Sequence, residues 1–200
     1  NQIPDVHLRL VEGPLIEIDI AKAIPVFGEM SNTTSLKVRA QYEENPYPRW
    51  ENLRVSEHAV SIAEVSDHLE LRLHSKYIEN VSSPHVLIAG CGTGLHPIAT
   101  ASRFANCQVK AVDLSLASLA FARRKATEFK ITNIEFCQAD ILQLSELEQR
   151  FDIVESVGVL HHMEDPMAGW KVLTNLLKPN GLIKVGLYSE LARRHITKVR

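Results

Sequence analysis

The sequence predicts an α/β fold in which a doubly wound, mainly parallel sheet carries helices on both faces. After residue 80, short runs rich in Val, Ile, Leu and Phe alternate with helical segments, and such runs are typical of strands covered on both faces. The first run leads through a glycine-rich loop into a helix, and the second ends at an acidic residue. Alternating strands and helices are joined by right-handed crossovers, so we expect a parallel sheet.

Cap and turn residues bound the elements of this alternation. The predicted strands are residues 85–90, 108–114, 134–140, 151–158 and 181–188, and the predicted helices are residues 94–105, 115–129, 143–149 and 166–177. Ser115 is a suitable N-cap for the second helix, and Asp165 followed by Pro166 suits the start of the last. Residues 178–181, Lys-Pro-Asn-Gly, predict a turn into the last strand.

Residues 1–56 are predicted to form an N-terminal arm. Residues 8–21 partly alternate apolar and charged side chains, which indicates a strand that glycine and proline cut short. Residues 31–44 predict a helix opened by Ser31 or Thr34, because these side chains satisfy free N–H groups at a helix start.

The segment that follows, residues 45–50, is predicted to be extended and to display two aromatic side chains. Its two prolines restrict the backbone, and Tyr47 and Trp50 stand beside them. These aromatics suit a lid or a partner surface, or they anchor the arm to the core. Residues 56–80 have the apolar spacing of an amphipathic helix that leads into the sheet.

Composition limits the classes of protein that the chain can form. With 200 residues and 45% hydrophobic content, it can bury one main core. A formal net charge of -2 argues against a broad basic surface for nucleic acid. No membrane span or secretory signal is apparent, and three cysteines without a CxxC pair predict reduced thiols. We therefore expect a soluble, cytoplasmic protein, and the start at Asn1 without methionine predicts a fragment or a processed chain.

The glycine-rich loop predicts a nucleotide pocket. The apolar run 86–89 is followed by Gly90, Gly92 and Gly94, which permit a tight turn and let a ligand approach the backbone. The helix start beyond them offers unpaired N–H groups. Asp113 ends the next strand, about 20 residues after the glycines, where doubly wound folds bind the hydroxyls of an adenosine ribose.

At this point the motifs, in their order, resemble those of the class I S-adenosylmethionine-dependent methyltransferases over roughly residues 81–200, which have a Rossmann-like fold. The matching stretches are VLIAGCGTG, VDLS, CQADI, FDIVESVGVLHHMEDP and LLKPNGLIKV. In addition, VRAQYEENPYPRW looks like the segment that precedes this domain in proteins that fuse it to tetratricopeptide repeats. The resemblance implies that residues 1–80 form an N-terminal arm, an aromatic segment and a lead-in helix. Residues 81–200 would form an S-adenosylmethionine-binding methyltransferase domain that is incomplete at its C-terminus.

The resemblance also implies roles for individual residues. The methionine part of S-adenosylmethionine would lie against Gly90, Cys91, Gly92 and Gly94. Asp113 would take the ribose hydroxyls, and Asp140 would accept from the adenine amino group. Leu114 and Ile141 would lie beside the adenine ring. Glu155, Ser156 and Val157 would face the reacting methyl group.

The sequence departs from the family's pattern at two points. Ile88 stands where the family usually has an acidic residue that steadies the first loop, so we expect lower cofactor affinity or a different support for the loop. The family fold has seven strands, whereas this chain ends after the fifth predicted strand. The C-terminal strand pair is thus expected to be missing, which would leave one sheet edge uncovered.

The implied reaction is direct displacement, in which a nucleophile attacks the sulfonium methyl group in line. The protein mainly positions the reactants and excludes water. His161 and His162 are candidate general bases for a nucleophile that starts protonated, and Glu155 could orient a cationic substrate or contact the cofactor. No metal site is predicted, because neither this pair nor the histidines within residues 56–80 have partners at zinc-ligand spacing.

Three functions remain open from the sequence. The first is a methyltransferase that acts on a small molecule or a protein side chain. The second is an NAD(P)-linked oxidoreductase, but Leu95 occupies the position where its fingerprint requires Gly or Ala. The third is a methyltransferase-like binding or assembly module without turnover. It is favoured by Ile88, the expected loss of the last strand pair and the aromatic arm.

Overall fold

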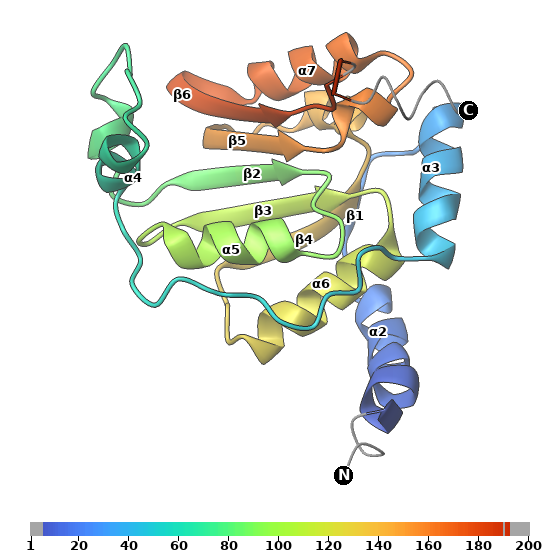
Figure 1. Ribbon diagram of the computed structural model, residues 1–200. Coiled ribbons are helices and arrows are strands. Elements are labelled where there is room, and N and C mark those ends of the chain that lie inside the picture. Colours follow the sequence, from blue (N-terminus) through green and yellow to red (C-terminus); the bar gives the residue numbers. More distant parts are fainter. Residues whose placement is uncertain (1–5, 190, 193–200) are drawn as a thin grey trace.

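The computed structural model describes residues 6–189, 191 and 192. Its strands lie side by side in one sheet with helices on both faces (Figure 1). All six strands are parallel, in the order β1-β4-β3-β2-β5-β6. They are β1 (Val26–Phe27), β2 (His85–Ala89), β3 (Gln108–Asp113), β4 (Ile134–Ala139), β5 (Phe151–Val157) and β6 (Leu177–Gly186). The predicted doubly wound, Rossmann-like fold is therefore confirmed.

The helices form a layer on each side of this sheet. They are α2 (Gly13–Lys22), α3 (Thr33–Glu44), α4 (Ile62–His68), α5 (Leu95–Arg103), α6 (Leu116–Glu128) and α7 (Pro166–Asn175). The shorter turns are the π-helical η1 (Leu8–Glu12) and the 3-10 turns η2 (Ile78–Asn80), η3 (Ile141–Glu146) and η4 (Leu160–His162). Within the described part of the chain, no helix combines the length and apolar character needed to span a bilayer.

The core is divided by the sheet into two apolar clusters. Along β2, Val86 and Ile88 face the cluster that contains α5 and α6, whereas Leu87 and Ala89 face the cluster that contains α7. Successive side chains of a strand point to opposite faces, so a strand covered on both sides must be apolar throughout. The continuous Val-Leu-Ile-Ala run of β2 meets this requirement.

Two helix starts have the predicted caps. The Ser115 hydroxyl accepts from the Ser118 N–H at 3.0 Å, at the start of α6. The Asp165 carboxylate accepts from the N–H groups of Met167 and Ala168 at 2.9 and 3.1 Å, at the start of α7. The cap residues therefore determine where these two helices begin.

Two predicted helices are wrong in type or length. Residues 143–149 do not form an α-helix, because η3 is a 3-10 turn that the Asp140 side chain starts by accepting from the Leu142 N–H. The helix predicted over 56–80 is reduced to α4, since Val60 pairs with the end of α5 and Glu70 adopts a φ of 51° just after the helix. A left-handed residue at this position ends a helix.

The last strand also differs from its prediction. β6 begins at Leu177, which pairs with Phe151, but the next paired residue is Leu182, opposite Ile153. The predicted turn at 178–181 is therefore an irregularity inside β6, and Asn180 there has a φ of 63°. In the described residues no strand lies beyond β6, which forms one edge of the sheet.

The predicted strand within residues 8–21 is wrong, because this segment is helical in η1 and α2. Pro14 lies in the first turn of α2, directly after the π-helical η1. The arm instead contributes β1, whose Val26 pairs with Gln138 at the other edge of the sheet. The helix predicted over 31–44 is confirmed as α3, but its cap is Asn32 rather than Ser31 or Thr34.

The segment at residues 45–50 is anchored to the core by its second aromatic. Trp50 is 8% exposed, and its indole N–H donates to the Thr93 carbonyl at 2.9 Å. Its ring meets Phe121 edge to face, with centroids 5.9 Å apart. Arg49 donates twice to the buried Glu17 carboxylate. The anchoring interpretation therefore holds for Trp50, while Tyr47 is 76% exposed.

Candidate active site

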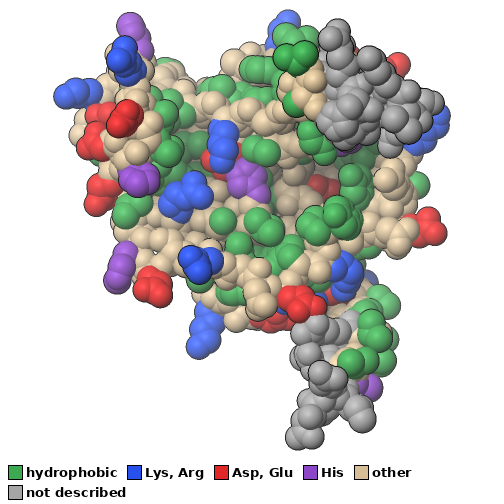
Figure 2. Space-filling model, in the orientation of Figure 1, with side chains coloured by type: hydrophobic (Ala, Val, Ile, Leu, Met, Phe, Trp, Pro, Cys, Tyr) green, Lys and Arg blue, Asp and Glu red, His purple; other side chains and the backbone are tan. Residues whose placement is uncertain are grey.

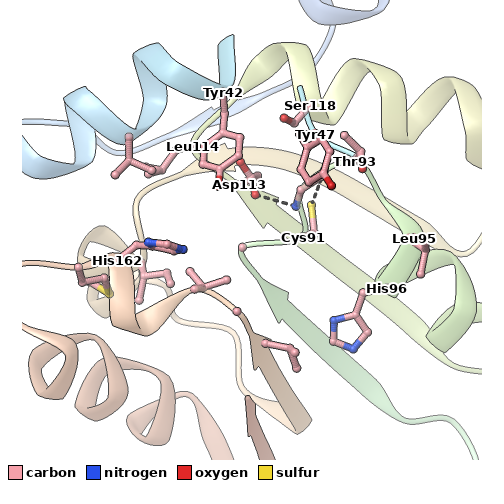
Figure 3. Close-up of a pocket in the computed structure, with 18 of the residues that line it drawn as sticks. Tyr42, Tyr47, Cys91, Thr93, Leu95, His96, Asp113, Leu114, Ser118 and His162 are labelled. Atoms are coloured by element: carbon pink, nitrogen blue, oxygen red, sulfur yellow. Dashed lines mark hydrogen bonds between the residues drawn. The ribbon is translucent and has the colours of Figure 1, made fainter. Parts of the chain in front are cut away.

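A large cavity lies where the parallel strands end, at the carboxyl edge of the sheet. Its volume is about 650 Å³, within the roughly 300–1,000 Å³ typical of small-molecule sites. Loops after β2, β3, β4 and β5 line it, and α3 and Tyr47 cover part of it. This edge is where open parallel sheets bind their ligands, and Figure 3 shows side chains from these elements converging on it.

The three glycines of the predicted pocket do different things. All have positive φ, at 76°, 52° and 88° for Gly90, Gly92 and Gly94. A Cβ at Gly92 would meet no atom within 4 Å, and this glycine lines the cavity. A Cβ at Gly94 would lie 2.5 Å from the Ala122 Cβ. Gly94 is absent from the cavity wall and allows α5 to approach α6 closely.

The loop is held by its neighbours in the absence of an acid at Ile88. Gly90 and Cys91 both donate their N–H groups to the Val112 carbonyl, at 2.8 and 2.9 Å. The Gly92 N–H donates to Asp113 Oδ2 at 2.7 Å (Figure 3). The Thr93 hydroxyl donates to the Pro48 carbonyl at 2.7 Å. Strand β3 and the anchored segment therefore support the loop.

Asp113 lies at the end of β3 with its carboxylate at the cavity. Its Oδ1 accepts from the Ser115 N–H at 3.0 Å, in addition to the bond with Gly92. Burial raises the pKa of Asp113 above its ordinary value, although these backbone hydrogen bonds lower it in part, and the nearby charge of Glu43 raises it further. Since an ionised carboxylate offers about four acceptor positions, it retains capacity for a ligand's hydroxyl groups.

The neighbouring part of the wall contains the other residues predicted at the nucleoside end. Leu114, Asp140 and Ile141 line the cavity. Asp140 is only 3% exposed, and its Oδ1 accepts from the Leu142 N–H at 3.0 Å. The carboxylates of Asp113 and Asp140 thus stand at the carboxyl ends of two adjacent strands, β3 and β4, as the sequence predicted.

Cys91 lies in the cavity wall but is not a reactive nucleophile. Its side chain is buried, and burial together with the negative charge of Asp113 raises the pKa of the thiol well above its ordinary value. A neutral thiol is a poor nucleophile. Cys91 therefore contributes shape and backbone contacts.

Two residues predicted at the end of β5 do not line the cavity. Glu155 and Ser156 are buried below its wall, and Val157 is the residue of this group that the cavity contacts. Glu155 Oε2 lies 2.7 Å from His96 Nε2 and accepts from the Thr100 hydroxyl at 3.0 Å. Burial acts to raise the pKa of Glu155, but the neighbouring His96, Lys184 and Thr100 side chains together outweigh it, so the pKa lies below its ordinary value.

The two adjacent histidines are separated by the geometry of η4. His162 lines the cavity, whereas His161 is not part of its wall. The His161 ring packs between His162 and Tyr188, with centroid distances of 4.2 and 4.0 Å. Only His162 is therefore placed to approach a bound molecule directly.

Sequence reasoning missed several residues of the wall. On α5, His96, Ala99 and Arg103 share the face that lines the cavity, and Lys184 of β6 reaches it as well. Positions three and four residues apart occupy one face of a helix, so the spacing on α5 was a usable signal. Nothing in the local sequence indicated Lys184 or the residues of α3, because both reach the cavity through tertiary packing.

Comparison with known proteins agrees with this geometry. Residues 86–181 match a family described as "Methyltransferase domain", and these residues contain the glycine loop, Asp113, Asp140 and η4. The chain carries a class I S-adenosylmethionine-dependent methyltransferase domain. The cofactor of this domain is S-adenosylmethionine.

Individual relatives of the methyltransferase domain match it over part of their length. The ubiquinone biosynthesis O-methyltransferase of Coxiella burnetii is 36% identical over 57% of this chain and 49% of its own length. The (S)-coclaurine N-methyltransferase of Papaver somniferum is 30% identical over 60% of this chain and 34% of its own. The chain thus spans half or less of the length of these curated relatives.

A solved structure described as "Conversion of a Disulfide Bond into a Thioacetal Group during Echinomycin Biosynthesis" also matches the methyltransferase domain. It superposes with a TM-score of 0.52 and 25% sequence identity, over 76% of this chain and 58% of that chain. No comparison supports the NAD(P)-linked oxidoreductase or the inactive module.

The residues present fit S-adenosylmethionine. The space where a Cβ of residue 92 would stand is open. A ligand can therefore approach the Gly92 backbone closely. The acceptor oxygens of Asp113 and Asp140 suit the hydroxyl and amino donors of an adenosine, and apolar Leu114 and Ile141 lie in the same wall. The cavity thus offers the polar and apolar contacts that an adenosine requires.

Proposed function

We propose that this chain transfers a methyl group from S-adenosylmethionine to an acceptor by in-line displacement. The observation that carries the proposal is one cavity that unites the open glycine backbone at Gly92 with the carboxylate of Asp113. When bound, the cofactor supplies a methyl group already activated by the positive charge of its sulfur. The protein's contribution is positioning and exclusion of water.

Roles for the wall residues follow from their positions. We assign the ribose hydroxyls to Asp113 and the adenine amino group to Asp140, with Leu114 and Ile141 against the ring. The backbone at Gly90–Gly92 would hold the methionine part of the cofactor. Gly94, Glu155 and Ser156 have no direct role in this proposal, because none of them lines the cavity.

His162 is the general base in this proposal for an acceptor that starts protonated. It lines the cavity from η4, directly beyond Val157–Val159 at the end of β5. An imidazole changes charge near neutral pH, so it can take a proton as the nucleophile attacks. His161 packs against the His162 ring and would fix its orientation.

The acceptor is a small molecule or a protein side chain in this proposal. A tetratricopeptide-repeat region in a longer protein, a division of the chain near residue 80 and a cytoplasmic location stay predictions from the sequence. The relatives matched here include both an O- and an N-methyltransferase, so their names do not decide the acceptor atom.

Calorimetric titration with S-adenosylhomocysteine tests the cofactor half of the proposal. We expect micromolar binding by the 200-residue chain, no binding of NAD, and at least a tenfold loss in Asp113→Ala, since two hydrogen bonds to a charged group are lost. Glu135→Gln, an exposed carboxylate of β4, is the matched control. Tight NAD binding, or an unchanged affinity in a folded Asp113→Ala variant, would contradict the proposal.

A further inference from the structure

The cavity has a second end whose charge is opposite to that of the nucleoside end. Its wall there contains His96 and Arg103 of α5 and Lys184 of β6. At the nucleoside end, the carboxylates of Asp113 and Asp140 stand at the carboxyl ends of β3 and β4. β4 and β6 are four interstrand steps apart in the sheet, which corresponds to roughly 19 Å at about 4.8 Å a step. Figure 2 shows cationic side chains gathered beside a histidine on this face.

The positive charge at this end exceeds the negative charge beneath it. Glu155 is the carboxylate next to this group, and it lies 2.7 Å from His96 Nε2 and 3.7 Å from Lys184 Nζ. Arg103 is partly buried and forms no ion pair with a carboxylate of the residues that the structure describes. A partly desolvated guanidinium is stabilised by an anion. The carboxylates of the described residues do not supply one to Arg103.

The remaining wall at this end is largely apolar. Leu95, Ala99 and Val157 line it, together with the aromatic ring of Tyr188. Small-molecule sites combine an apolar wall with a few polar groups that fix orientation. The combination selects a molecule with an apolar or aromatic body and one anionic group.

We propose that this end of the cavity binds a small-molecule methyl acceptor through a carboxylate or phosphate group. Arg103 and Lys184 hold the anion, because a guanidinium fork pairs with either group through two hydrogen bonds and an ammonium adds a point charge. Glu155 positions His96 beside them through the 2.7 Å contact. This inference rests on the proposed function, since it places the acceptor next to the assigned cofactor end.

The test is a calorimetric titration of the 200-residue chain, with and without saturating S-adenosylhomocysteine. The probes are benzoate, phenyl phosphate and neutral benzamide, which share one ring and differ in charge. We expect an anionic probe to bind at least tenfold more tightly than benzamide. The tighter of benzoate and phenyl phosphate identifies the acceptor's anionic group.

Charge-removing variants then locate the site. Arg103→Gln and Lys184→Gln should each weaken the binding of the anionic probe at least tenfold. The affinities for benzamide and S-adenosylhomocysteine should stay unchanged. Matched controls are Arg72→Gln and Lys171→Gln, because both side chains are exposed and lie outside the cavity wall. These controls should bind all probes like the parent chain.

Several outcomes would overturn the inference. Equal binding of benzamide and the anions, or binding of a glutamate-rich peptide without binding of either small anion, rejects a small anionic acceptor. A parallel loss of S-adenosylhomocysteine affinity in Arg103→Gln shows that the cations serve the cofactor's own carboxylate. If the anion binds through Arg103 but S-adenosylhomocysteine does not bind, the anion site stands and the proposed function fails.

Discussion

At the residue scale, Asp113 connects the cofactor end of the cavity to the loop that forms it. Its two oxygens accept from Gly92 and Ser115, so one side chain fixes the loop after β2 and the turn after β3. Burial raises its pKa, which means that part of its binding capacity depends on pH.

Binding of S-adenosylhomocysteine is expected to weaken as the pH falls from neutral into the acidic range. Hydroxyl donors favour the ionised carboxylate, so the bound state has the lower pKa and affinity is lost as the pH falls through the raised pKa of free Asp113. Calorimetry across this pH range measures the effect. Asp113→Asn, which cannot ionise, should lose this dependence, and an equally steep decline in that variant would contradict the assignment.

Alanine substitutions at Gly92 and Gly94 are expected to change the free energy of unfolding by different amounts. Gly94→Ala should lower the free energy of unfolding by about 2–4 kcal/mol, because its Cβ would lie 2.5 Å from the Ala122 Cβ at a φ of 88°. Gly92→Ala should cost only about 1 kcal/mol of backbone strain, since the space around its Cβ is open.

The same pair separates stability from binding. Gly92→Ala should lower the affinity for S-adenosylhomocysteine at least tenfold, because the new methyl group enters the space that the cofactor needs. Urea unfolding and calorimetry on both variants provide the two readouts. A Gly92→Ala protein that binds normally would show that the ligand does not approach this backbone.

At the element scale, the end of α3 is hydrogen-bonded to the start of α6 beside the cavity. Glu43 accepts from the N–H groups of Leu116 and Ala117 at 2.8 and 2.9 Å, and the Ser115 hydroxyl donates to the Tyr42 carbonyl at 3.1 Å. An acidic side chain at a helix N-terminus satisfies free N–H groups and complements the helix dipole. A helix from the arm thus helps to cap a helix of the core.

Glu43→Ala should lower the free energy of unfolding by about 1–2 kcal/mol, the usual cost of losing a helix cap. Denaturant unfolding measures this change. Glu44→Ala serves as the control, since Glu44 is the exposed neighbour on the same helix. Equal stability of the two variants would mean that the α3–α6 contact contributes nothing in solution.

At the scale of the whole molecule, the arm and the sheet form one site. Residues of α3 and Tyr47 line the same cavity as the loops after β2 to β5. Trp50 attaches the arm to the core, and β1 attaches it to the sheet edge (Figure 1). A ligand in the cavity would therefore contact two segments that are far apart in the sequence.

Saturation with S-adenosylhomocysteine is expected to slow amide hydrogen exchange in α3 and in residues 45–50, as well as in the glycine loop. Exchange requires local opening, and a ligand that bridges both segments opposes it. Mass spectrometry of the exchanged chain gives the measurement, with α7 on the other sheet face as the internal reference. Protection of the glycine loop without α3 would show that α3 does not cover the bound ligand.

Taken by itself, the sequence determined the order of strands and helices after residue 80, the glycine loop and the positions of Asp113 and Asp140. These features are local, since burial of a strand on both faces, a tight turn and a helix cap each depend on residues close together in the chain. The family resemblance rested on the same local motifs.

Only the tertiary structure decided how the arm, α5 and β6 complete the site. The strand predicted at 8–21 became a helix, Val26–Phe27 joined the sheet, and Glu155 turned out to pair with His96 below the cavity. Each outcome depends on contacts between segments far apart in the sequence, where packing outweighs local pattern. For the same reason, the charge at the second end of the cavity emerged only when α5 and β6 came together.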